Sequence, residues 1–178
     1  MMKKMLGPVV SALSVAERAD VLVALIEAHP ELADEAERLA GSLLGDHDRE
    51  RTAHTVAAEL RRLHLEDLAD RAGPQWGGGY VDPIDAAYEL IQEAVQPYLD
   101  DVTRRARAGA RAAALEVGLG LLSGLYGCRH EDDHDLVLVQ AGLPDVIDHQ
   151  VDHVIAAMDK AGLSIPDGWM ADQCPEWT

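Results

Sequence analysis

Apolar residues recur at helical spacing along almost the whole chain, and short polar or glycine- and proline-containing segments separate the runs. Such stripes of apolar residues predict helices over residues 14–28, 30–45, 48–64, 82–106, 110–126, 136–141 and 145–160. A short piece over residues 65–71, expected as a turn, leads into a glycine-rich segment. No strand-like alternation of comparable length interrupts them. The pattern therefore predicts an all-α fold, an irregular array or bundle of seven to nine helices arranged as antiparallel hairpins.

Residues that favour helix ends mark several boundaries. Ser14 and Glu17 have the spacing of a capping box at the start of the helix over residues 14–28. His29-Pro30 ends that helix, because the residue before a proline avoids helical backbone angles. Asp82-Pro83 supplies an N-cap followed by proline at the first helical position. The centre of the helix over residues 14–28 is apolar nearly all round, which predicts that this helix is buried.

The main interruption of the helical pattern is the glycine-rich run Gly73-Pro74-Gln75-Trp76-Gly77-Gly78-Gly79-Tyr80-Val81-Asp82-Pro83. It predicts a connector within a single helical domain, which spans residues 1–178. The expected parts are sub-lobes 1–72 and 82–161, the flexible connector 73–81, and an extended tail over residues 162–178 that lies across the core.

Two features inside the predicted helices require tertiary packing. Pro97 either kinks the helix over residues 82–106 or starts a new one, and the continuing apolar stripe favours a kink. Gly118, Gly120 and Gly124 fall in the middle of the helix over residues 110–126, where each glycine costs about 1 kcal/mol relative to alanine. We therefore expect this helix to approach a neighbouring backbone closely.

Candidate partner-binding residues are Trp76 and Tyr80 in the connector, and Arg104 and Arg107 in the helix that follows. The two aromatic residues are expected to anchor the connector on the core. The arginines belong to a group predicted to lie on the exposed side of its helix: Arg104, Arg105, Arg107 and Arg111. An acidic partner or a phosphate is one possible ligand of this group, and pairing with carboxylates of neighbouring helices is the alternative.

The charge balance restricts the classes of partner. The 15 basic and 32 acidic residues give a net charge of −17, which repels nucleic acid and anionic membranes. We therefore expect no nucleic acid and no membrane as partners. An acidic decoy that imitates nucleic acid would have the same composition, although a solvated acidic surface is a more common reason for it.

The N-terminus and the cysteines bear on the cellular compartment. Lys3 and Lys4 precede an apolar run that weakly resembles a signal peptide, but Gly7-Pro8 breaks this run. Cys128 and Cys174 are the only cysteines and form no disulfide framework. Free thiols in a reducing cytoplasm are the expected state.

The densest group of potential metal ligands lies near the C-terminus, in the loop 128–135 and the helix that follows. His149 and His153 are four residues apart, so both imidazoles can reach one metal ion, with Asp152 beside them. An inverted zinc-protease motif would have glutamate in place of Asp152, and the shorter aspartate does not reach a metal-bound water. A divalent-metal site at these residues is one hypothesis, and a solvated polar face is the alternative. No other cofactor and no catalytic residue is predicted.

Four segments between residues 55 and 160 share a pattern with known sequences: Gly79-Tyr80-Val81-Asp82-Pro83, Ala86-Ala87-Tyr88-Glu89-Leu90, Pro97-Tyr98-Leu99-Asp100-Asp101 and Gly124-Leu125-Tyr126. This region resembles a helical region of uncharacterised bacterial proteins, some of which are associated with SWIM-type zinc fingers. The resemblance implies an all-helical module of unknown activity. The cysteine and histidine pattern of the zinc finger itself is missing, so the resemblance implies neither a metal nor a nucleic-acid function.

No motif in the sequence specifies a reaction, and three hypotheses of function follow. The first and favoured one is a helical protein–protein interaction module that binds a protein partner or a second copy of itself. The second is a metal-dependent enzyme that uses the Asp- and His-rich C-terminal region, which requires three side chains to converge in a pocket. The third is an acidic decoy or immunity-type inhibitor.

Overall fold

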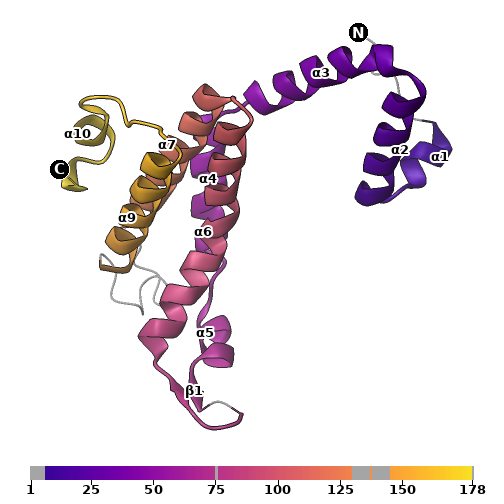
Figure 1. Ribbon diagram of the computed structural model, residues 1–178. Coiled ribbons are helices and arrows are strands. Elements are labelled where there is room, and N and C mark those ends of the chain that lie inside the picture. The colour runs from indigo at the N-terminus through magenta and orange to yellow at the C-terminus, as the bar shows by residue number, and fades with distance from the viewer. Residues whose placement is uncertain (1–6, 75, 130–136, 138–144, 178) are drawn as a thin grey trace. The chain divides into compact units, whose positions relative to one another are not determined.

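The computed structural model describes residues 7–74, 76–129, 137 and 145–177, and these residues are predominantly helical (Figure 1). They form nine α-helices, two short 3-10 helices and one two-stranded hairpin. The predicted all-α class is therefore confirmed. Among the described residues, no helix has the length and apolar character needed to cross a membrane. The chain divides into two compact units, residues 1–43 and residues 44–178.

Unit 1 is made of short helices with well-defined ends. It contains α1 (Pro8–Ala12), α2 (Val15–Ala28), the 3-10 helix η1 (Pro30–Leu32) and most of α3 (Ala33–Gly45). The predicted capping box is present: the Glu17 N–H donates to Ser14 Oγ at 3.3 Å, and the Ser14 N–H donates to Glu17 Oε2 at 2.8 Å. α2 ends at His29, whose N–H donates to the carbonyl oxygen of Leu25 at 2.9 Å.

Within unit 1 taken by itself, the helix over residues 14–28 is exposed and not buried as the sequence predicts. No residue of α2 is buried, and Val21, Leu22, Val23 and Leu25 are all exposed. The other elements of unit 1 are the five-residue α1, the three-residue η1 and part of α3, and they offer too little surface to cover a helix that is apolar on every side.

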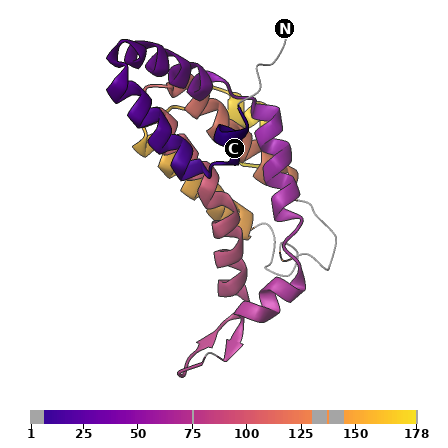
Figure 2. The ribbon, with the colours of Figure 1, turned by 90° about the vertical axis from the view of Figure 1, so that its right-hand side faces the viewer.

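Unit 2 contains the hydrophobic core, which is built around one central helix. Its main helices are α4 (Arg49–Leu60), α5 (Leu65–Arg71), α6 (Pro83–Arg107), α7 (Arg111–Gly127) and α9 (Asp145–Lys160). α7 packs against α4, α6 and α9, and α6 packs against α5 and α9 as well (Figures 1 and 2). Ten of the 17 residues of α7 are buried, which explains why this helix is apolar on all sides.

The glycines of α7 allow it to approach α4 closely, as the sequence predicts. A Cβ atom at Gly120 would lie 2.7 Å from the carbonyl oxygen of Arg49, and one at Gly124 would lie 2.8 Å from that of Ala53. A Cβ atom at Gly118 would instead meet the flexible side chain of Met158 in α9. Because Gly120 and Gly124 have no side chains, the α7 backbone can lie this close to the α4 backbone.

α6 is one continuous helix that passes through Pro97 and does not restart there. The Asp82 side chain caps its first turn by accepting from the Ile84 N–H at 2.9 Å. The prediction that Arg105 lies on the exposed side is wrong, because only 11% of its side chain is exposed. Arg105 pairs with Asp101 Oδ2 at 2.8 Å and donates to the carbonyl oxygen of Leu44, so partners on both sides compensate its burial.

The described residues of segment 73–81, predicted as a flexible connector between two lobes, form a β-hairpin between α5 and α6. β1 (Gly73–Pro74) pairs antiparallel with β2 (Tyr80–Val81), with Gly73 opposite Val81. In Figures 1 and 2 the hairpin lies beyond the first turn of α6, at the end of that helix near α5. The division into units falls between residues 43 and 44, because α4 packs on α7 and so joins the later helices.

The C-terminal residues pack against the core, but as short helical turns rather than as an extended tail. They include α10 (Trp169–Gln173) and the 3-10 helix η2 (Pro175–Trp177). The indole N–H of Trp177 donates to Asp148 Oδ1 at 2.6 Å, and its ring meets the edge of Tyr126 at 5.1 Å. Arg129 pairs with both Asp148 and Glu176, which fastens this segment to α9 and to the end of α7.

The helical piece predicted over residues 136–141 and most of the ligand-rich loop 128–135 lie outside the described residues. Val137 is described and buried, and its N–H donates to the carbonyl oxygen of Leu63 at 2.9 Å.

Candidate functional site

The tip of the β-hairpin exposes large apolar side chains. Trp76 is 106% exposed, Tyr80 is 67% exposed, and Ile84 in the first turn of α6 is 52% exposed. The prediction that Trp76 and Tyr80 anchor the segment on the core is therefore wrong. Gly77, Gly78 and Gly79 have no side chains that could cover the aromatic rings. All three have φ angles between 90° and 135°, a backbone region that favours glycine.

The hairpin is attached to the core at both ends. On the α5 side, Leu68 is buried, and Arg71 donates two hydrogen bonds of 2.8 Å to the carboxylate of Glu93 in α6. These bonds raise the pKa of Arg71 and lower that of Glu93. On the α6 side, Val81 packs against the core and Asp82 caps the helix. The exposed aromatic side chains therefore project from a supported turn.

Carboxylates surround the hairpin in the sequence. Residues 65–93 carry seven acidic side chains and a single basic one, Arg71. That arginine already pairs with Glu93 and lies 3.7 Å from a carboxylate oxygen of Glu89. The apolar tip is thus set among uncompensated negative charges, which attract a positively charged surface and repel nucleic acid.

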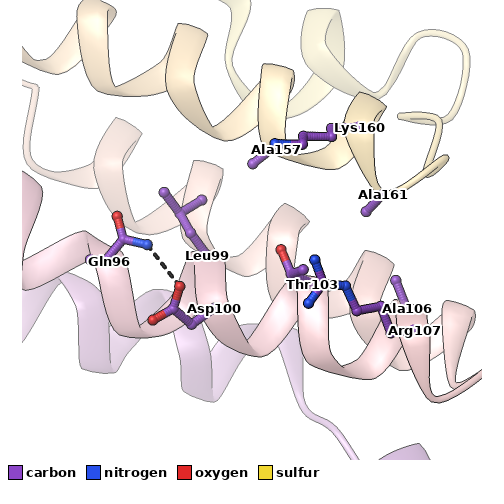
Figure 3. Close-up of a pocket in the computed structure, with 9 residues that line it drawn as sticks. All are labelled: Gln96, Leu99, Asp100, Thr103, Ala106, Arg107, Ala157, Lys160 and Ala161. Carbon is purple, nitrogen blue, oxygen red and sulfur yellow. Dashed lines mark hydrogen bonds between the residues drawn. The ribbon is translucent and has the colours of Figure 1, made fainter.

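The structure separates the two arginines that the sequence groups as partner-binding residues. Arg104 pairs with Asp101 and does not contact the hairpin residues in any described interaction. Arg107 lines a groove between α6 and α9, where the side chain of Lys160 faces it across the groove (Figure 3). Sequence reasoning missed Lys160, because its position 53 residues after Arg107 gives no indication that α9 packs beside α6.

His149 and His153 lie together on the exposed face of α9. Their ring centroids are 4.8 Å apart, and the His149 ring also meets the ring of Tyr88 in α6 edge-on at 5.5 Å. Asp152 is exposed on the same helix. Within the described residues, no three histidine, cysteine, aspartate or glutamate side chains gather closely enough to hold a metal ion. Most of the ligand-rich loop lies outside the described residues, so the metal hypothesis stays a prediction.

Both cysteines are buried, and this determines their reactivity. Cys128 Sγ lies 3.9 Å from the carbonyl oxygen of Ala57. Burial raises the pKa of the Cys174 thiol to about 11, so it carries almost no thiolate at neutral pH. Because the thiolate is the nucleophile, the structure offers no activated cysteine at position 174.

We expect both thiols to react slowly with Ellman's reagent in the native protein at about pH 8, because access and, at Cys174, ionisation are both suppressed. In urea, two equivalents per chain should react rapidly. The absorbance of the released thiolate measures both rates. Rapid reaction of one equivalent in the native protein would show that the C-terminal turn carrying Cys174 opens readily.

Comparisons of the chain with protein-family models, with curated proteins and with solved structures find no match. The resemblance to the helical region associated with SWIM-type zinc fingers therefore stays a prediction.

Proposed function

We propose that the chain is a helical protein–protein interaction module that binds a basic protein partner through the tip of its β-hairpin. The observation that carries the proposal is the complete exposure of Trp76 on a turn that the rest of unit 2 supports. Tryptophan and tyrosine are the residues most enriched among those that dominate binding energy at protein interfaces. An unsupported loop would lose conformational entropy on binding, whereas a supported one loses less.

The charges around the tip favour one class of partner. Seven carboxylates and one arginine between residues 65 and 93 give a surface that steers a basic partner toward the aromatic side chains. The proposed partner therefore has an apolar pocket for the indole ring, and lysines or arginines around that pocket. The acidic-decoy hypothesis uses the charge without the aromatic side chains, and it does not explain why Trp76 and Tyr80 are exposed.

The proposal can be tested by placing benzoylphenylalanine, a photo-crosslinking amino acid that keeps a large aromatic side chain, at position 76 and irradiating the protein in extract of its native cells. A discrete crosslinked protein with a basic surface is expected. Unlabelled wild-type protein should suppress the crosslink, and a Trp76→Ala competitor should be at least about thirtyfold less effective. This ratio corresponds to a loss of about 2 kcal/mol of binding free energy, as is typical of a dominant interface residue. Crosslinking should also weaken with salt.

Position 58 provides the matched control, because Ala58 is an exposed residue of α4 in the same unit. The same crosslinker at position 58 should not capture the protein captured at position 76. Equal capture at both positions, or equal competition by wild type and Trp76→Ala, would refute the proposal. A crosslinked product of twice the chain mass would identify the partner as a second copy and would refute the basic partner.

A further inference from the structure

We propose that the groove between α6 and α9 binds a small phosphorylated polyol, such as a sugar phosphate. The groove has a volume of about 420 Å³, which lies within the range of small-molecule sites. It exists because the facing residues Ala106, Ala157 and Ala161 are too small to fill the space between the helices. These alanines and Leu99 supply its apolar walls, and polar groups occupy both ends (Figure 3).

Two cations from different helices line the groove without a carboxylate partner. Arg107 comes from α6 and Lys160 from α9, and neither makes an ion pair within the described part of the chain. Their neighbours differ in this respect: Arg104 pairs with Asp101, and Arg111 donates to the carbonyl oxygens of Ala161 and Gly162. Both side chains are exposed, and together they place two positive charges beside the groove on a protein of net charge −17.

Basic residues in the last turn of a helix commonly compensate the partial negative charge of the helix end. The direction of these side chains argues for more than that role. In Figure 3 the Lys160 side chain runs back along α9 toward Ala157, and the Arg107 guanidinium lies beside Thr103. Both cations thus line the groove, and Arg107 lies beside the Thr103 hydroxyl, which can donate a further hydrogen bond (Figure 3).

The chemistry of the cationic end fits a phosphate group. A guanidinium binds two phosphate oxygens in a fork, an ammonium adds a point charge, and the two together match a phosphate dianion. The opposite end is different, because Gln96 Nε2 donates to Asp100 Oδ1 at 2.8 Å and so orients the Asp100 carboxylate. That carboxylate repels a second anionic group and accepts hydrogen bonds from hydroxyls.

The spacing of the two ends sets an upper limit on the length of the ligand, because the Arg107 side chain runs back toward Thr103 (Figure 3). Asp100 and Arg107 are seven residues apart on α6, which separates their backbone positions by about 10 Å along the helix. A pentose or hexose with a terminal phosphate can span the groove with its phosphate at Arg107 and Lys160. This site uses none of the hairpin residues, so it stands or fails independently of the proposed protein interaction.

Calorimetric titration with ribose 5-phosphate, inorganic phosphate and ribose tests the proposal on the intact chain. Ribose 5-phosphate should bind with saturation at roughly millimolar concentration or below, and at least tenfold more tightly than inorganic phosphate. Ribose alone should not bind measurably. If inorganic phosphate binds as tightly as the ester, the polyol part of the proposal is wrong. If neither binds up to roughly 10 mM, the whole proposal is wrong.

Variants assign the binding to this groove. Arg107→Gln and Lys160→Gln should each weaken ribose 5-phosphate at least tenfold. Arg62→Gln, which removes one positive charge from an exposed position in another groove, is the matched control and should leave the affinity unchanged. Asp100→Asn should reduce the preference for the ester over inorganic phosphate. Equal effects of Arg62→Gln and Lys160→Gln would show that binding follows net charge and not this site.

Discussion

Gly124→Ala should lower the free energy of unfolding by about 2–3 kcal/mol, although alanine is the better helix former. The added methyl group would lie 2.8 Å from both the carbonyl oxygen of Ala53 and the Cβ atom of Val56. Neither atom can move unless the α4 backbone moves, so the helices must separate and lose contacts along the interface. This loss exceeds the gain of about 1 kcal/mol from helix propensity. Urea denaturation followed by circular dichroism measures the difference.

Gly118→Ala is the matched control on the same helix. Its methyl group would lie 2.6 Å from Met158 Sδ, and a methionine side chain has three rotatable bonds with which to move away. The gain in helix propensity should nearly offset this rearrangement, and the variant should stay within about 1 kcal/mol of the wild type. If the two variants lose equal stability, close approach of α4 to α7 is not the reason for Gly124.

Asp101→Ala should cost about 2–3 kcal/mol, because it leaves the Arg105 guanidinium largely buried without a counter-charge. Arg105 would retain its hydrogen bond to the carbonyl oxygen of Leu44, which keeps the effect below that of a fully orphaned charge. Asp100→Ala removes the same charge from the adjacent, exposed position and should change stability by less than about 0.5 kcal/mol. Equal losses would refute the role given to the ion pair.

The ion pair also predicts a dependence of stability on pH. Burial opposes ionisation of Asp101, but hydrogen bonds from Arg105 and Arg104 outweigh it and hold the pKa of this carboxyl below its usual value. As the pH falls below about 5, Asp101 takes up a proton in the unfolded chain before it does so in the folded protein. The stability that the ion pair contributes is therefore lost progressively as the pH falls through the lowered pKa of Asp101 in the folded protein. Asp101→Asn should show a smaller loss of stability over this acidic range than the wild type. Identical pH profiles would contradict the pairing.

A double variant separates the pair from the individual residues. Arg105→Met in the Asp101→Ala background removes the buried charge and retains an apolar side chain of similar length. It should recover part of the stability lost in Asp101→Ala. If the double variant is instead less stable than the single one, Arg105 contributes through its contact with Leu44 and not through Asp101.

Local signals in the sequence were sufficient for most of the fold. The capping residues Ser14 and Asp82 predict the starts of α2 and α6, and His29-Pro30 predicts the end of α2. These residues act through the backbone of their own helix, so no other part of the chain is needed to interpret them. The glycines of α7 predict a close helix contact for a similar reason, since a mid-helix glycine is unfavourable without one.

Exposure of side chains was predicted less well. Trp76 and Tyr80 were expected on the core and Arg105 in solvent, and the structure places each of them in the opposite environment. An aromatic residue in a glycine-rich segment packs inward or projects outward depending on what the turn lies against. An arginine can be buried only where distant carbonyls and carboxylates meet it. Neither condition can be determined from the neighbouring sequence.

The sequence alone therefore determines that this chain is all-α, where most of its helices begin and end, and that its surface is strongly acidic. These properties follow from periodicity, capping and composition, which act over a few residues or over the whole chain. Only the tertiary structure decides that Trp76 projects from a supported hairpin and that Lys160 faces Arg107 across a groove. Each depends on contacts between residues far apart in the sequence, and helix packing brings those residues together.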